Sequence, residues 1–311
     1  MKIILKSYSL LLLILLGTLW GTGYSIARFA MTNGVPPLGY SFWQSLGPAI
    51  IIGSIVLSRK KSSPTIGKQT PWLYYFICGL TGIVIPNTSM YFAAAHLPAS
   101  ILAMVVNTVP IVAYPMALLV RLEAFSWQRM LGILLAFAGL MLIILPKSSL
   151  PSPEMVPWVL STLITPLSFA ICSIYIARFR PAHTDSLTLS MGMLCFATIL
   201  LVPLVVYTKS FYLFHLPFTL ADWVILLEIL LSSLGYMLFF QLIKVAGPVY
   251  YSLVDTVVVL TGIFWGKILF HEVLNKWTAT AVLLILFALV LVTQQQRKVT
   301  KSLQLANNDG T

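Results

Sequence analysis

Residues 11–29 read LLLILLGTLWGTGYSIARF, and residues 160–179 read LSTLITPLSFAICSIYIARF. Both stretches are long and apolar, and both end in the four letters IARF. Arg28 and Arg178 therefore lie 150 positions apart in a chain of 311 residues. A four-letter match can arise by chance, so it requires a second point of registration.

The second point of registration is a pair of glutamates, Glu123 and Glu272, which lie 149 positions apart. Each follows one apolar stretch and precedes a tryptophan and another apolar stretch. Self-similarity at a fixed offset indicates a duplicated unit. We therefore predict two repeats, at residues 1–150 and 151–296. The polar composition of residues 297–311 predicts a short disordered cytoplasmic tail.

The composition of the chain places it in a lipid bilayer. Hydrophobic residues make up 59% of the sequence and charged residues only 9%, whereas a soluble domain contains about 25% charged residues. So few charges cannot cover a water-facing surface. Continuous apolar runs of about 20 residues are instead typical of membrane-spanning helices. These runs fall at 8–32, 38–58, 72–94, 98–120, 127–146, 156–179, 186–208, 221–244, 248–271 and 276–293.

The runs predict an all-α integral membrane protein with ten transmembrane helices, five in each repeat. A unit with five spans starts on one side of the membrane and ends on the other, so the second copy enters the membrane inverted. Two inverted repeats are a recurrent design of secondary transporters, in which the substrate site lies between the repeats near the midplane.

The placement of lysine and arginine predicts the orientation. If the N-terminus is cytoplasmic, 14 of the 19 Lys and Arg residues fall on the cytoplasmic side, as the positive-inside rule requires. We therefore predict a multi-pass protein of the cytoplasmic (inner) membrane with both termini in the cytoplasm. The net charge of +11 follows from this topology, so the sequence does not predict nucleic-acid binding.

A set of short motifs accompanies the duplication. The motifs of the first repeat are Trp20-Gly21, Asn107-x-x-Pro110 before Glu123, and a span with Gly132 and Gly139. The second repeat departs from this set, because Ala170-Ile171 replace the Trp-Gly pair and Val259 replaces the proline. Together they resemble the EamA-type members of the drug/metabolite transporter superfamily. The resemblance implies a ten-helix secondary carrier of small organic metabolites.

The predicted substrate site combines aromatic side chains with a few polar groups deep in the spans. Such a lining is typical of sites for organic ligands. Asn107 and Thr256 occupy equivalent positions of the two repeats, although hydrogen bonding between helices is the alternative role for both. The predicted central-cavity residues are Trp20, Tyr24, Asn87, Tyr91, Asn107, Tyr175, Tyr236, Gln241, Asp255 and Thr256.

Three ionisable groups lie inside predicted spans, where an unpaired charge is costly. Glu228 and Lys267 lie at similar depths, so they either form an ion pair or take part in coupling, while Lys267 can instead extend its amine to the interface. Asp255 is too deep to reach the interface. Its depth favours coupling of transport to protonation over a purely structural role.

The two glutamates that mark the repeats, Glu123 and Glu272, lie at the ends of predicted spans. We expect both to be helix-terminal charges at the lipid interface and to lie outside the central cavity.

The sequence favours a secondary transporter over two alternatives, a channel-like facilitator and an integral-membrane enzyme. A channel usually needs a polar filter or charged rings, and an enzyme needs converging catalytic groups. Neither is visible, nor is a nucleotide-binding or metal-binding motif. We therefore predict no enzymatic activity, catalytic residue, metal, cofactor or ATPase subunit. The expected partners are a small-molecule substrate and the lipid bilayer, and the sequence leaves a homodimer open.

Overall fold

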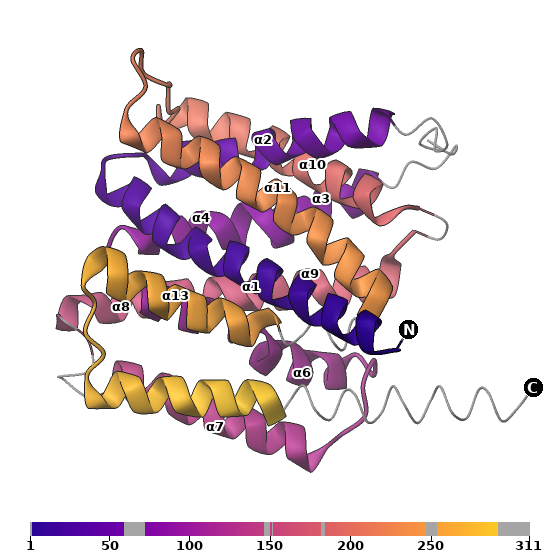
Figure 1. Ribbon diagram of the computed structural model, residues 1–311, viewed down its shortest axis with the longest axis vertical. Helices are drawn as coiled ribbons and strands as arrows, with labels where there is room; N and C mark the ends of the chain where they lie inside the picture. Colours follow the sequence, from indigo (N-terminus) through magenta and orange to yellow (C-terminus); the bar gives the residue numbers. More distant parts are fainter. Residues whose placement is uncertain are drawn as a thin grey trace, which may run out of the picture.

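The computed structural model of the protein describes residues 2–58, 72–145, 150, 152–181, 184–246 and 254–291. Their regular secondary structure is entirely helical, and the long helices lie side by side in a bundle (Figure 1). The first half contains α1 (Lys2–Thr32), α2 (Pro37–Ser58), α3 (Trp72–Gly79), the π-helix η1 (Leu80–Val84), α4 (Ile85–Ala94), α5 (Ala99–Val106), α6 (Val109–Leu119) and α7 (Trp127–Ile144). The second half contains the 3₁₀ helix η2 (Pro153–Met155), α8 (Val156–Thr162), α9 (Ile164–Phe179), α10 (Ser186–Tyr207), α11 (Leu220–Ala246), α13 (Val254–Phe270) and a last helix, Lys276–Leu291.

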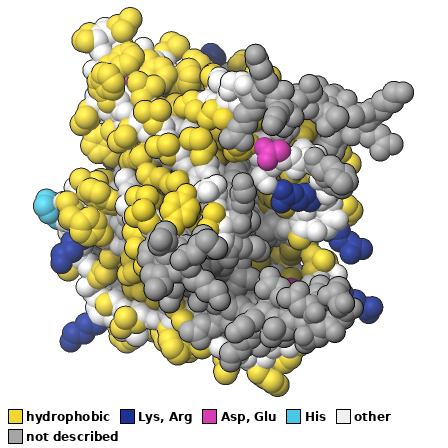
Figure 2. Space-filling model, turned by 45° about the vertical axis from the view of Figure 1, so that its right-hand side comes forward, with side chains coloured by type: hydrophobic (Ala, Val, Ile, Leu, Met, Phe, Trp, Pro, Cys, Tyr) yellow, Lys and Arg dark blue, Asp and Glu magenta, His cyan; other side chains and the backbone are white. Residues whose placement is uncertain are grey.

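The predicted all-α membrane architecture is confirmed. Eight helical segments are long and apolar enough to cross a membrane, and the shorter apolar helix Lys276–Leu291 follows them. The part of the ninth predicted run that precedes α13, residues 248–253, lies outside the described residues. The surface in Figure 2 is largely hydrophobic with few charged side chains, as contact with hydrocarbon requires. The count of ten spans and the inversion of the second repeat stay predictions.

The turn between α1 and α2 follows from its sequence. The Val35 N–H donates to the Ala30 carbonyl at 3.1 Å, and the Gly34 N–H donates to the Met31 carbonyl at 3.3 Å. This pair of bonds is the Schellman motif that ends many helices. Gly34 has a φ of +83°, which glycine adopts without a steric penalty. The proline at position 37 then opens α2, where its missing N–H costs nothing.

Helix α1 packs against both α11 and α13 (Figure 1). A Cβ atom at Gly21 would lie 2.5 Å from Cβ of Thr261 and 2.7 Å from the Val258 carbonyl oxygen. Only a residue without a side chain fits there, and small residues let helices approach closely in a membrane. The glycine of the Trp20-Gly21 motif therefore permits the contact between α1 and α13.

The packing also relates the two halves. Helix α1 of the first half contacts α13 of the second, and α9 of the second half contacts α6 of the first. Helices α1 and α9 carry the repeated IARF sequence, and α6 and α13 both precede a marker glutamate. The contact of α1 with α13 is therefore the repeat equivalent of the contact of α9 with α6.

Candidate substrate site

The helical segment between Ala99 and Leu119 is broken in its middle. Helix α5 ends at Val106 and α6 begins at Val109. Between them, Asn107 has φ and ψ of −80° and 14°, outside the α-helical range. The break follows from Pro110, which has no N–H to continue the helical hydrogen bonds but is well tolerated in the first turn of a helix.

Asn107 connects this break to α1. Its side-chain amide donates to the Ala103 carbonyl at 2.7 Å and to the hydroxyl of Tyr24 at 3.1 Å. Both side chains are buried, and Asp255 lies close enough to act electrostatically on the Tyr24 phenol. The Asn107 Oδ1 atom accepts no hydrogen bond from a described residue, so an acceptor remains available beside the break.

Trp20 lies one turn before Tyr24 on α1 and packs against α11. Its ring centroid is 6.4 Å from that of Tyr236, with the rings edge to face, and 5.9 Å from that of Phe239. A Cβ atom at Gly235 would lie 2.4 Å from Trp20 Nε1, so this glycine makes room for the indole. Trp20, Tyr236 and Phe239 thus form one aromatic group between α1 and α11, and Tyr24 lies one turn further along α1.

Glu228 is the most buried of the three ionisable groups predicted inside spans, with 8% of its surface exposed. Its Oε1 atom accepts a hydrogen bond of 3.1 Å from the Ser232 hydroxyl, whereas Oε2 has no hydrogen-bond partner among the described residues. The Tyr40 hydroxyl is also buried, and no described residue hydrogen-bonds to it. The Tyr40 and Tyr91 rings meet edge to face at 4.7 Å, and both interact electrostatically with Glu228. Glu228 therefore lies in a tyrosine-rich environment and forms no ion pair with any residue that the structure describes.

The predicted ion pair between Glu228 and Lys267 is not formed. Lys267 is exposed and makes no ion pair with a described residue. The similar depths of the two residues predicted the pair, but depth does not determine which way a side chain points around its helix. Lys267 faces outward, which leaves extension toward the interface as its role.

The described part of α13 begins at Val254, so Asp255 lies in its first turn. Asp255 and Thr256 are both partly exposed. The predicted depth of Asp255 relied on residues 248–253, which lie outside the described residues. Asp255 forms no ion pair with a described residue.

Two predicted cavity residues make their contacts outside the aromatic group around Trp20, and a third forms no hydrogen bond with that group among the described residues. Tyr175 stacks with Tyr74 at 5.8 Å near the end of α9. Gln241 donates to the Tyr8 hydroxyl at 3.4 Å near the start of α1. Asn87 is partly exposed on α4. The central placement of Tyr175 and Gln241 stays a prediction, since residue type and span membership do not reveal which end of a span faces a neighbour.

Sequence reasoning missed an ion pair between α1 and the end of α13. Arg28 Nη1 contacts Glu272 Oε1 across 244 positions of the chain. The same carboxylate accepts hydrogen bonds from the backbone N–H groups of Ala99 at 2.7 Å and Ser100 at 3.1 Å. The expectation that Glu272 is only an interfacial charge is therefore wrong. The repeated IARF and glutamate markers identified both residues but not their contact.

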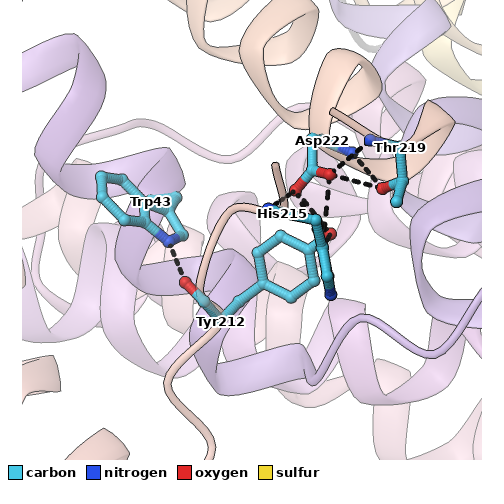
Figure 3. Close-up of polar contacts among 5 residues, drawn as sticks. All are labelled: Trp43, Tyr212, His215, Thr219 and Asp222. Atoms are coloured by element: carbon cyan, nitrogen blue, oxygen red, sulfur yellow. Dashed lines mark hydrogen bonds and ion pairs between the residues drawn. The ribbon is translucent and has the colours of Figure 1, made fainter. Parts of the chain in front are cut away.

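A second missed cluster holds the connection between α10 and α11 (Figure 3). Fully buried Asp222 accepts hydrogen bonds from the Thr219 N–H at 2.7 Å and the Tyr212 hydroxyl at 2.9 Å, and His215 lies 3.3 Å away. Burial and the hydrogen bond to the Asp222 carboxylate raise the pKa of Tyr212. The Thr-x-x-Asp spacing of a helix-capping box could have found this cluster. Its partners satisfy Asp222, which makes its role structural.

Two cavities lie away from the central aromatic group. One of about 690 Å³ is bordered by the α1–α2 turn and the connection before α11, including Asn33, His215 and Thr219. The other, of about 450 Å³, lies between the ends of α6 and α9 and is bordered by Val120, Arg178 and Phe179, among others. Among the described residues, no three His, Cys, Asp or Glu side chains are grouped to hold a metal ion.

The bundle of apolar helices with two related halves defines a multi-pass membrane protein of transporter architecture. A family model places it more narrowly, because the EamA-like transporter family matches residues 7–145 and again residues 156–294. The chain belongs to this family, within the drug/metabolite transporter superfamily. The predicted resemblance is thereby confirmed, and the two matched segments confirm the two-repeat architecture.

Individual relatives agree with this assignment. The chain is 26% identical to Protein PecM of Dickeya dadantii (strain 3937) over 276 residues, which cover 88% of each protein. It is also 26% identical to the WAT1-related protein At3g53210 of Arabidopsis thaliana over 137 residues, covering 40% of this chain and 37% of that one. A solved crystal structure has the same fold, with a TM-score of 0.64 at 17% identity, and covers 94% of this chain and 99% of its own.

Proposed function

We propose that the protein is a secondary carrier that moves a small organic metabolite across the cytoplasmic membrane by alternating access. Membership of a transporter family supports the class of activity. The observation that carries the mechanism is the broken helix at Asn107, between two related halves. Discontinuous helices at a repeat interface form the substrate sites of many secondary transporters.

The substrate site in this proposal lies where α1 and α11 meet the break. Trp20 and Tyr236 supply ring surfaces, the Oδ1 atom of Asn107 accepts a hydrogen bond, and Asp255 supplies a carboxylate near Tyr24. These groups favour an organic substrate with an apolar or aromatic body and at least one hydrogen-bond donor, because a few polar groups in an apolar lining determine orientation.

Coupling in this proposal belongs to Asp255. A carboxylate without a cation inside a predicted span is costly when charged, so its protonation lets the site close around the substrate, and its ionisation on the other side reopens it. Glu228, which also forms no ion pair with a described residue, is the alternative coupling group.

The test begins with a thermal-shift screen of the purified protein against metabolite pools. A ligand at 100 times its dissociation constant stabilises the folded state by about 2.7 kcal/mol. Each compound found is then offered, labelled, to liposomes that contain the protein. Saturable uptake with counterflow supports a carrier, flux without counterflow supports a channel-like facilitator, and chemical alteration of the compound supports an enzyme.

A further inference from the structure

The Arg28–Glu272 ion pair links three helices at one end of the bundle. Glu272 is joined to α1 through Arg28 and to the start of α5 through the Ala99 and Ser100 N–H groups. The Arg28 guanidinium also lies 4.4 Å from the Phe270 ring centroid. The side chains of Arg28 and Glu272 are only 22% and 9% exposed. One carboxylate thus holds three elements together at the end shown on the left of Figure 1.

The internal repeat places the equivalent residues, Arg178 and Glu123, near the opposite end. Arg178 follows Arg28 by 150 positions, and Glu272 follows Glu123 by 149. The backbone supports the equivalence, because the helices before both glutamates end in residues with positive φ, Arg121 at 55° and His271 at 53°.

At that end the pair is not formed. Arg178 is exposed and has no hydrogen bond or ion pair with a described residue. Glu123 instead contacts Arg129 of its own half through Oε2, and its side chain is 33% exposed. The cavity of about 450 Å³ bordered by Val120, Arg178 and Phe179 separates the ends of α6 and α9.

The two ends therefore differ although they are built from equivalent residues. At one end arginine and glutamate are in contact across the halves, and at the other the equivalent pair is not formed and Arg178 borders a cavity. The cavity beside Asn33 at the first end is not bordered by Arg28 or Glu272. Glu123 Oε1 accepts no hydrogen bond from a described residue, so it can receive Arg178 while Oε2 keeps Arg129. The buried guanidinium of Arg129 would then retain its partner, which avoids the penalty of an unpaired buried charge.

From this difference we infer that Arg28–Glu272 and Arg178–Glu123 are two alternating ionic latches, of which one is closed while the other is open. Opening the Arg28 end brings Arg178 to Glu123 and closes the cavity between α6 and α9. The inference rests on the proposed alternating access and names the side chains that hold each end shut. Because the two latches are linked through one conformational equilibrium, weakening the first must favour the second.

The test measures the distance between the ends of α6 and α9 directly, without substrate. Cysteines replace Val120 and Phe179 in a chain whose Cys78, Cys172 and Cys195 are changed to alanine. Spin labels on the two new cysteines then report the distance across the cavity in nanodiscs of phosphatidylethanolamine and phosphatidylglycerol.

Glu272→Gln should increase the short-distance population about fivefold, the lower range for coupled sites. Adding Glu123→Gln or Arg178→Gln should remove that increase, whereas adding Arg178→Lys, which keeps the positive charge, should retain it. Glu154→Gln, at an exposed glutamate, is the matched control and should change nothing. If Glu272→Gln does not fold, Arg28→Gln breaks the same latch from its other partner.

The inference is overturned if neither Glu272→Gln nor Arg28→Gln changes the distances, or if the change persists without Glu123 and Arg178. Counterflow together with unresponsive distances would reject the latches and leave the carrier intact. Responsive distances without flux of any compound would support the latches and count against the proposed carrier.

Discussion

The side-chain amide of Asn107 donates a hydrogen bond to the hydroxyl of Tyr24 at 3.1 Å, although 83 positions separate them in the chain. The contact joins α1 to the break between α5 and α6, and both residues were predicted from sequence to line the site. It therefore gives the proposed substrate site a defined centre that mutation can test.

Asn107→Ala should weaken ligand binding at least about fivefold, because one hydrogen bond to a buried group contributes on the order of 1 kcal/mol or more. Tyr24→Phe should lower stability by only about 0.6 kcal/mol, the average for hydrogen bonds between helices in a membrane. Titration with the compound found by thermal shift measures the affinity, and unfolding without the compound measures the stability. Tyr175→Phe, at a tyrosine outside the group, is the control. Unchanged affinity in Asn107→Ala would remove Asn107 from the site.

Asp255→Asn should leave the protein folded and ligand binding largely intact while abolishing the pH dependence of flux, because the amide cannot bind or release the coupling proton. Flux into liposomes at several pH values measures this. Asp185→Asn is the matched control: Asp185 caps α10 by accepting from the Leu187 N–H at 3.2 Å, and asparagine caps a helix equally well. An unchanged pH profile in Asp255→Asn would make Asp255 structural and move the coupling role to Glu228 or remove it.

Glu228 and Lys267 should behave independently, since no ion pair joins them. Lys267→Met should change the unfolding free energy by less than about 0.5 kcal/mol, as is usual for exposed positions. Glu228→Gln should not lower the melting temperature, because glutamine can keep the Ser232 hydrogen bond and removes a buried charge. A coupling energy above about 1 kcal/mol in the double-mutant cycle would instead show that the two residues interact.

Gly21→Ala should lower the melting temperature and the yield of folded protein. The added methyl group would meet Thr261 and the Val258 carbonyl, and overpacking typically costs about 1–3 kcal/mol. Gly53→Ala is the control, because its nearest contact would be Met191 Sδ at an ordinary 3.5 Å and alanine favours a helix. Equal effects of both changes would contradict close packing of α1 on α13.

The topology can be tested with reporter fusions. A fusion after Gln296 should report the cytoplasm, and a fusion in the loop around Ser148 should report the external side, as the distribution of Lys and Arg predicts. If both sites report the same side, the second repeat, which lies between them, does not contain an odd number of spans, and the inverted arrangement fails.

The sequence by itself determined the class of the protein. Apolar run length and charge content predicted membrane helices, because crossing hydrocarbon depends on local length and polarity. The IARF and glutamate markers predicted the duplication, which the two matched segments of the family model confirm. Pro110 accounts for the break between α5 and α6 that the structure shows, because proline removes a backbone hydrogen bond.

Only the tertiary structure decided which side chains meet. The sequence marked Arg28 as the equivalent of Arg178, and Glu272 as the equivalent of Glu123. It could not show that Arg28 and Glu272 form an ion pair while Arg178 and Glu123 do not. It also grouped Tyr175 with Tyr24, whereas in the structure Tyr175 stacks with Tyr74 and Tyr24 bonds to Asn107. Periodicity gives the depth of a residue in its own helix, whereas a contact depends on the rotation and packing of two helices far apart in the chain, which no local pattern encodes.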